Sequence, residues 1–280
     1  MVTVDNDPEA RMIRLLAEHA GIAMIVSQQE YGARLELEPN IGLCIRLAGK
    51  KTVCTVEIPG PEIEADLVRR GFVVKCIDHH DYGTDLKRSR GPDGKHLPSS
   101  LEQFLAFFEI TDAEMLSWGW NPHTVRGLGI FDDRYVQGLR DEGYQHEQID
   151  AVIGLRNSFM LELDPSFMEN YRAAATLWVQ KDYLGPYILI VSPHEQSVRA
   201  NIGLLSIGDG LDTQPIIVSD RGGQEVFVQN VDPETVTGLQ EAFGSDKTFT
   251  FGAGRCWGVN NGKGNGPAAS LDQILQHLIA

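Results

Sequence analysis

The chain has 280 residues, an apolar content of 42% and a formal net charge of −15. This length and apolar content allow a full hydrophobic core in one large domain or two ordinary ones. The acidic balance argues against a protein that wraps long nucleic acid, because such binding neutralises many phosphates with lysine and arginine. A short substrate in a local basic pocket is compatible with this charge.

The predicted elements of the first half alternate between strands and helices. Apolar runs predict strands at 2–4, 22–26, 52–57 and 72–77, and the stretch 35–60 has β character, with a probable turn at 49–51. Helical spacing and end signals predict helices at 10–20, 62–70 and 99–108, the first capped by Asp7 before a proline. This alternation favours a largely parallel sheet.

The later part of the chain continues the same alternation after a helical stretch. Further helices are predicted at 124–128, 145–156, 165–180, 194–206, 233–243 and 270–279. Strands are predicted at 187–191, 215–219 and 225–229. Residues 157–181 carry no strand signal. We therefore expect a two-domain α/β protein, with a larger domain at 1–157, a helical linker at 158–183 and a smaller α/β domain at 184–280.

The four cysteines lie far apart and form no C-x-x-C pair, so neither a zinc cluster nor a disulfide scaffold is indicated. Reduced, buried thiols are the expectation. The chain opens with no basic region followed by an apolar core, and no run approaches ~20 apolar residues. We expect a cytoplasmic protein without a membrane partner.

The run Asp78-His79-His80 stands at the end of the strand predicted at 72–77. A strand that stops at adjacent carboxylate and imidazole groups is typical of metal ligands at the carboxyl edge of an α/β sheet. Other acids also follow predicted strands or an apolar turn, namely Asp5, Asp7, Glu57, Asp132 and Asp133. If Asp132 and Asp133 lay in extended backbone, their side chains would point opposite ways, so only one would face such a site.

So many carboxylates in one place repel one another unless cations lie between them. Mixed carboxylate and imidazole ligands suit Mn²⁺ or Mg²⁺ better than a metal that prefers thiolates. Two such ions a few Å apart would clamp a phosphoryl group and generate hydroxide from bound water. The sequence therefore predicts a metal site at this sheet edge.

These residues resemble the motifs of the DHH phosphoesterase superfamily, which includes single-strand exonucleases, oligoribonucleases, cyclic-dinucleotide phosphodiesterases and manganese pyrophosphatases. Residues 52–61 (TVCTVEIPGP) and 73–80 (VVKCIDHH) are similar to its second and third motifs. Asp5-Asn6-Asp7 resembles the first, and residues 129–139 (GIFDDRYVQGL) resemble the fourth. Residues 251–255 (FGAGR) are similar to the glycine-rich element of the smaller domain that accompanies DHH domains.

The resemblance implies a parallel-sheet DHH-like domain with two Mn²⁺ or Mg²⁺ ions and a second, smaller substrate-binding domain. The implied metal ligands are Asp5, Asp7, Glu57, Asp78, His79 and Asp133, where the motif favours Asp133 over its neighbour. Catalysis is assigned to Asp78 and His80. Substrate contacts are assigned to His80, Gly252, Gly254 and Arg255.

The implied function is hydrolysis of a small phosphodiester, such as a short oligonucleotide or a cyclic or linear dinucleotide. Two positions depart from the pattern: Met1 stands where the family usually has a histidine, and Glu57 where it usually has an aspartate. The alternative is a degenerate member that binds a nucleotide or a protein partner without hydrolysis, and a third is a pyrophosphatase. A homodimer is left open.

Blander interpretations stand beside these. Asp78-His79-His80 could form a solvated surface turn. The acids at 5 and 7 could only cap a helix. Residues 252–266 could be a plain glycine-rich loop rather than a phosphate cradle.

Overall fold

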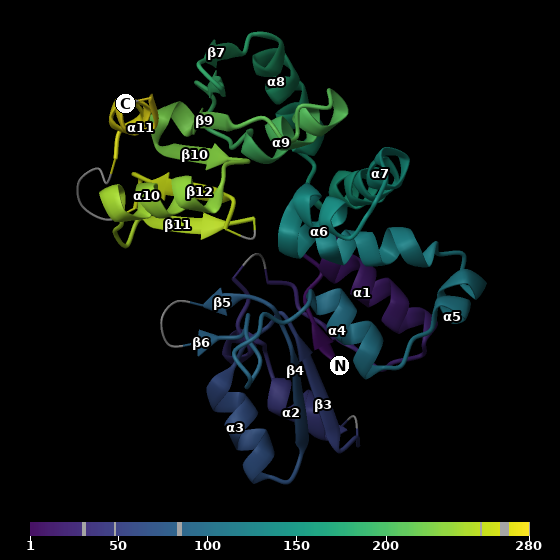
Figure 1. The fold of residues 1–280 in the computed structure, drawn as a ribbon. Coiled ribbons are helices and arrows are strands. Elements are labelled where there is room, and N and C mark those ends of the chain that lie inside the picture. The colour runs from purple at the N-terminus through teal and green to yellow at the C-terminus, as the bar shows by residue number, and fades with distance from the viewer. Residues whose placement is uncertain (30–31, 48, 83–85, 253, 264–268, 280) are drawn as a thin grey trace. The chain divides into compact units, whose positions relative to one another are not determined.

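The computed structural model describes residues 1–29, 32–47, 49–82, 86–252, 254–263 and 269–279, and it divides into two compact units at 1–163 and 164–280 (Figure 1). The segment expected as a helical linker, 158–183, contains the end of one helix and the whole of the next, and the division lies inside it. The roles assigned to the two domains stay a prediction. Within the described residues, no helix combines the length and apolar character needed to cross a bilayer.

The first unit is built on a parallel four-stranded sheet, as the alternation of elements predicts. The strand order is β2 (Ile25–Val26), β1 (Val2–Thr3), β3 (Thr52–Val56) and β4 (Val73–Ile77). Thr3 lies opposite Val56, and Val56 lies opposite Ile77. The residues that follow these three strands therefore meet at one edge of the sheet, which places Glu57 beside Asp78.

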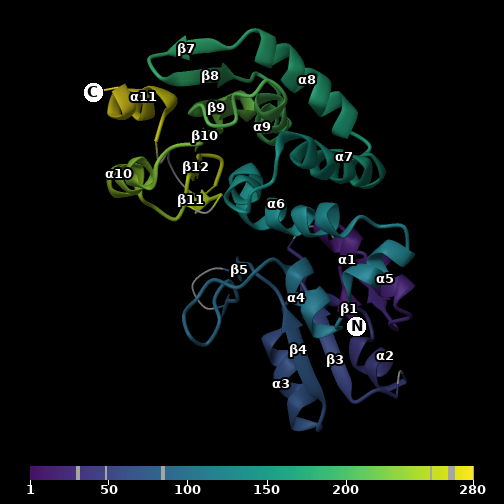
Figure 2. The same cartoon turned by 45° about the vertical axis from the view of Figure 1, so that its right-hand side comes forward.

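Helices cover both faces of this sheet (Figure 2). One face packs against α1 (Pro8–His19), α4 (Ser100–Phe107) and α6 (Pro122–Asp141), whose apolar side chains include Met12, Phe104 and Leu128. The other face packs against η1 (Leu35–Leu37), α2 (Ile41–Leu47) and α3 (Pro61–Arg69). The unit also contains the hairpin β5 (Asp81–Tyr82) and β6 (Leu86–Lys87), and the helices α5 (Asp112–Ser117) and α7 (His146–Leu163).

The expected β character of residues 35–60 is wrong for most of that stretch. The segment forms η1 and α2 before β3 begins at Thr52. Ile41 and Ile45 are both buried, and their spacing of four residues puts them on one face of α2. Short apolar runs of this kind fit a strand or a helix equally well, and tertiary packing decides between them.

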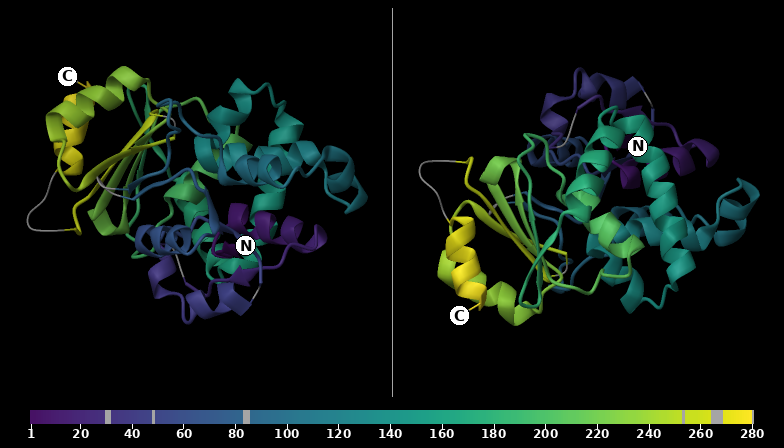
Figure 3. Two further views of the ribbon diagram at one scale, coloured as in Figure 1. Left: turned by 90° about the horizontal axis from the view of Figure 1, so that it is seen from below. Right: turned by 90° about the horizontal axis from the view of Figure 1, so that it is seen from above.

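The second unit is a mixed six-stranded sheet between two pairs of helices (Figure 3). The strand order is β11 (Thr248–Phe251), β12 (Cys256–Asn260), β10 (Glu225–Gln229), β9 (Ile216–Asp220), β8 (Tyr187–Val191) and β7 (Asp182–Leu184). Among these described strands, β8 and β9 pair in parallel and the other neighbours pair antiparallel. One face carries α8 (Phe167–Val179) and α9 (Arg199–Gly208), and the other carries α10 (Pro233–Phe243) and α11 (Leu271–Ile279).

Two predictions about the second unit need correction. The helix expected at 194–206 begins only at Arg199, because the buried carboxylate of Asp220 accepts hydrogen bonds from the backbone N–H groups of Val198 and Arg199. The segment 252–266, expected as one glycine-rich loop, contains β12. Its residues 253 and 264–266 lie outside the described part of the chain.

Candidate metal centre

The second and third predicted motifs meet at the carboxyl edge of the parallel sheet. Asp78 follows β4 and is 3% exposed, and Glu57 follows β3 and is 8% exposed. Glu57 has a φ of 53°, a left-handed conformation that is uncommon for a residue with a side chain. Such strained backbone persists only where surrounding contacts hold it, and it clusters at functional sites. The interpretation of 78–80 as a solvated surface turn does not fit this burial.

His79 is held between two helices. Its Nδ1 accepts a hydrogen bond of 3.0 Å from the backbone N–H of Ser100, at the start of α4. Its Nε2 lies 3.4 Å from Oδ2 of Asp132, in the middle of α6. Because Nδ1 accepts a hydrogen bond, the neutral ring carries its own proton on Nε2 and presents it to Asp132. Burial lowers the pKa of His79, but Asp132 outweighs that effect and the net pKa is raised.

His80 is oriented by Asp78. One carboxylate oxygen of Asp78, Oδ1, accepts a hydrogen bond of 3.0 Å from the His80 backbone N–H and lies 3.2 Å from His80 Nδ1. Nδ1 is also 3.8 Å from Oε1 of Glu57. Burial lowers the pKa of His80, but the hydrogen bond to Asp78 and the charges of Glu57 and Asp132 raise it to about 9. The ring is therefore cationic at neutral pH when no metal is bound.

Glu9 belongs to the same cluster, and the sequence analysis missed it. Its side chain is fully buried, Oε1 accepts a 2.8 Å hydrogen bond from the backbone N–H of Leu101, and Oε2 lies 3.6 Å from His79 Nδ1. A signal was present: Glu9, Ile13 and Leu16 follow helical spacing along the buried stripe of α1. A carboxylate in an apolar stripe is rarely buried without a partner.

Gly129 allows α6 to approach this cluster closely. A Cβ atom at this position would lie 2.4 Å from Ser99 Oγ and 3.1 Å from Glu9 Oε1. Asp132 comes one turn later on the same helix, and helical neighbours three residues apart share a face. The missing side chain at Gly129 thus lets α6 bring Asp132 up to His79.

Three buried carboxylate oxygens in this cluster have no hydrogen-bond partner among the described residues. They are Glu9 Oε2, Glu57 Oε1 and Asp78 Oδ2. Burial raises the pKa of Asp7, Glu9 and Glu57, and repulsion between these acids and Asp132 adds to the rise. A cation among them would satisfy the oxygens and relieve the repulsion, so the donor set fits a metal ion.

Two groups of potential ligand atoms share His79. Glu57, His79 and His80 form one group, and Glu9, His79 and Asp132 form the other. In each group the ligand atoms lie within 4.8 Å of one another. Carboxylates and imidazoles of this kind suit Mn²⁺ or Mg²⁺. Which of these residues bind a metal, and how many ions they hold, stays a prediction.

The two acids expected from the first motif have different surroundings. Asp7 caps α1, accepting a 2.8 Å hydrogen bond from Ala10 N–H, and lies close enough to Glu57 for repulsion to raise its pKa. Asp5 instead forms ion pairs with Arg11 at 2.5 Å and Arg14 at 3.2 Å. These arginines already neutralise Asp5, which is not in either group of ligand atoms.

The structure brings Asp132, and not the expected Asp133, beside His79. These residues lie in α6 and not in extended backbone, so their side chains point about 100° apart around the helix. Asp132 lies 3.4 Å from His79, whereas Asp133 lies 3.7 Å from His96 and 3.6 Å from Arg134. Metal binding by either aspartate stays a prediction.

The expected substrate-binding residues of the second unit lie between β11 and β12. Gly252 and Gly254 have φ angles of 58° and 76°, the left-handed conformation that glycine adopts without strain. Arg255 is exposed, and its backbone N–H donates to the carbonyl of Gly252 at 3.1 Å. Phosphate contact by these residues stays a prediction.

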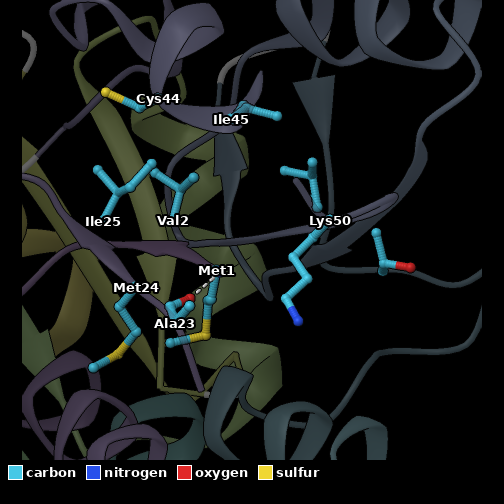
Figure 4. Close-up of a pocket in the computed structure, with 10 residues that line it drawn as sticks. Met1, Val2, Ala23, Met24, Ile25, Cys44, Ile45 and Lys50 are labelled. Atoms are coloured by element: carbon cyan, nitrogen blue, oxygen red, sulfur yellow. Dashed lines mark hydrogen bonds between the residues drawn. The ribbon is translucent and has the colours of Figure 1, made fainter. Parts of the chain in front are cut away.

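Met1 lines a separate pocket in the first unit (Figure 4). It is lined mostly by apolar side chains from the ends of β1, β2 and β3 and from α2, including Met1, Ile25 and Ile45. Lys50 is the charged side chain among the described lining residues. Met1, which stands where the family usually has a histidine, contributes its thioether to this apolar pocket.

Comparisons with known proteins give matches only among solved structures, and neither a family profile nor a curated protein matches the chain. A structure of the exonuclease RecJ bound to manganese is 14% identical, covers 92% of this chain and 84% of its own, and has a TM-score of 0.40. An exopolyphosphatase-related protein from Bacteroides fragilis is 11% identical. The match covers 99% of this chain and 88% of that protein, with a TM-score of 0.40.

A third structure, the DHH domain of a member of the s1p family of ribosomal proteins, is 13% identical. The match covers 99% of this chain and 84% of that domain, with a TM-score of 0.47. In its motifs, and in the place of these motifs at the strand ends, the chain resembles the DHH phosphoesterase superfamily, and the solved structures that it matches include a DHH domain.

Proposed function

We propose that the protein is a metal-dependent phosphoesterase. The observation that carries the proposal is the set of three buried carboxylate oxygens without a hydrogen bond, on Glu9, Glu57 and Asp78, beside His79 and His80. Burying several carboxylates together is costly, and this cost is offset when a divalent cation binds them. A bound cation of this kind neutralises phosphate charge and lowers the pKa of its water ligand. Mn²⁺ is the first ion to test, because it accepts both carboxylate and imidazole ligands.

The residues of the chain would divide the work as follows. Glu9, Glu57, Asp78 and Asp132 supply oxygen ligands, and Asp7 adds negative charge next to them. His79 accepts from Ser100 N–H at Nδ1, so it would ligate through Nε2 only if its ring proton moved to Nδ1 and that hydrogen bond were lost. His80, cationic and held by Asp78, would stabilise negative charge developing on a phosphoryl oxygen.

The proposed substrate is a small phosphodiester, a short oligonucleotide or a dinucleotide. The net charge of −15 supports a short substrate, because a long strand needs many cationic contacts. Pyrophosphate belongs in any substrate panel as well, since a divalent ion that clamps a phosphoryl group serves esters and anhydrides alike.

The test is turnover by purified protein loaded with Mn²⁺, on a panel of dinucleotides, short oligonucleotides, mononucleotides and pyrophosphate. Asp78→Asn should abolish turnover, whereas the matched change Asp66→Asn, on the surface of α3, should leave it unchanged. Metal analysis of the same samples gives the ion and its stoichiometry. Protein that holds Mn²⁺ and hydrolyses nothing would overturn the phosphoesterase proposal.

A second candidate is a member that binds nucleotides without hydrolysis. It is favoured by Asp5, which the guanidinium groups of Arg11 and Arg14 neutralise, and by the departures at Met1 and Glu57. Stoichiometric binding of a dinucleotide without any product would support it.

A further inference from the structure

Three phenylalanine rings lie together on one face of the second unit's sheet, and we call them the phenylalanine platform. Phe227 comes from β10, and Phe249 and Phe251 come from the edge strand β11. The ring centroids are 6.1 Å apart for Phe227 and Phe249, 6.3 Å for Phe227 and Phe251, and 5.9 Å for Phe249 and Phe251. Phe227 is 5% exposed and Phe249 is 42% exposed. The platform thus runs from the core out to solvent.

Gly258 makes this cluster possible. It lies on β12, between the two other strands, and is in register with both Phe227 and Phe249. A Cβ atom at Gly258 would lie 2.8 Å from Cζ of Phe249 and 3.1 Å from Cδ1 of Phe227. The glycine therefore lets the rings meet across the middle strand, and one of them remains open to solvent.

Two arginines lie beside the platform. The guanidinium carbon of Arg199, at the start of α9, is 5.0 Å from the Phe227 ring centroid and 4.9 Å from that of Phe251. Arg255 directly precedes Cys256, which lies opposite Phe251 in the register of β11 and β12, so its backbone lies next to the platform. Within the described residues, neither arginine forms an ion pair.

The pairing of a free aromatic surface with two cations fits one ligand class best. Every nucleobase has a flat π-face that stacks on an aromatic ring, and this stacking tolerates different sequences. An arginine against aromatic rings both extends the stacking surface and pairs with phosphate oxygens. A base-free phosphate would use the arginines alone, and in a chain with a net charge of −15 two unpaired cations favour an anion.

We propose that the phenylalanine platform, with Arg199 and Arg255, binds one nucleotide unit, stacking its base on Phe249 and pairing its phosphate with the arginines. This inference rests on the proposed function and names the substrate class: an ester that carries a nucleobase, as opposed to a base-free polyphosphate.

The test compares adenosine 5′-monophosphate with ribose 5-phosphate, which lacks the base. The full chain is used with a chelator present, so that no metal ion takes part in binding, and affinities are measured by NMR titration. The wild type should bind the nucleotide about tenfold more tightly than the sugar phosphate. Phe249→Leu, which keeps apolar packing, should remove that preference, and Phe249→Tyr, which keeps the ring, should retain it. Arg199→Gln should weaken both ligands.

The control for a general surface effect is Tyr183→Ala, because Tyr183 is 65% exposed on β7, the opposite edge strand. It should leave both affinities unchanged. The inference is overturned if the wild type binds both ligands equally, if Phe249→Leu keeps the preference, or if neither ligand binds at about 10 mM.

Failure of this inference and failure of the proposed function give different results. Nucleotide preference is measured with a chelator and hydrolysis with Mn²⁺, so each result is obtained without the other. A protein that prefers the nucleotide but hydrolyses nothing supports the platform and contradicts the phosphoesterase. Rapid hydrolysis without any preference for a base supports the phosphoesterase and contradicts the platform.

Discussion

Nε2 of His79 lies 3.4 Å from Oδ2 of Asp132, although the two residues lie far apart in the sequence. The opposite nitrogen, Nδ1, accepts a hydrogen bond from Ser100 N–H. The ring is thus fixed on one side by α4 and on the other by α6. The neutral ring therefore presents its Nε2 proton to Asp132, and an ion bound at Nε2 would require that proton to move to Nδ1.

The first prediction distinguishes Asp132 from its neighbour. Asp132→Ala should weaken Mn²⁺ binding by about 10–100-fold, because it removes either a ligand or the group that orients His79. Asp133→Ala is the matched control and should leave affinity nearly unchanged, since Asp133 faces His96 and Arg134. Titration calorimetry measures both. Equal losses for the two variants would mean that the cluster, as described, does not hold the ion.

Residues at the ends of strands were predictable from sequence. Glu57 and Asp78 each follow an apolar run, and parallel strands end at the same edge of a sheet, so the two acids had to lie near each other. Residues on helices were not. The choice of Asp133 came from the motif alone, which could not show that α6 would bring Asp132 beside His79.

The burial of Glu9 has the same physical origin. Glu9 resembled an ordinary acid in the first turn of a helix, where the helix dipole favours negative charge. Its burial depends on α4 and α6 packing over α1, contacts that no local pattern of residues encodes. The partners of Asp5 are local by contrast, because Arg11 and Arg14 stand on successive turns of the adjacent helix α1.

The second prediction concerns the cost of burying Glu9. Glu9→Gln keeps an oxygen that can accept from Leu101 N–H but removes a buried charge. Because burial raises the pKa of Glu9, ionising it opposes folding, and this loss of stability grows as the pH rises above the unfolded value. At pH 8 the metal-free variant should therefore melt about 2–4 °C higher than the wild type.

With metal bound, the difference in melting temperature between the variant and the wild type should be reversed. Wild-type protein in saturating Mn²⁺ should melt at a higher temperature than the variant, because ligand binding stabilises only the folded chain. Scanning calorimetry with and without Mn²⁺ measures both differences. A variant that is less stable than the wild type in the absence of metal would show that Glu9 is a purely structural residue.

The third prediction is that His80 titrates with a pKa of about 9 in the metal-free protein. The folded-state value lies above the ordinary 6.5, so the ion pair with Asp78 contributes its full stability below that pH. The contribution is lost as the pH rises through about 9. NMR titration of the imidazole signals measures the pKa, and His80→Gln identifies the signal by removing it. Asp78→Asn should lower the value, and an unchanged value would remove Asp78 as its cause.

The fourth prediction is that metal binding releases protons. Burial raises the pKa of Glu9 and Glu57, which are proposed as ligands, whereas a divalent ion needs unprotonated ligands. Affinity for Mn²⁺ should therefore rise with pH, by about tenfold per unit for each proton released. Calorimetric titration in two buffers of different ionisation enthalpy counts the protons directly. Glu9→Gln, which has one acid fewer, should release fewer protons than the wild type if Glu9 is protonated before the ion binds. An affinity that stays constant from about pH 6 to pH 8 would contradict the assignment of these acids as ligands, because no protonated group would then be displaced.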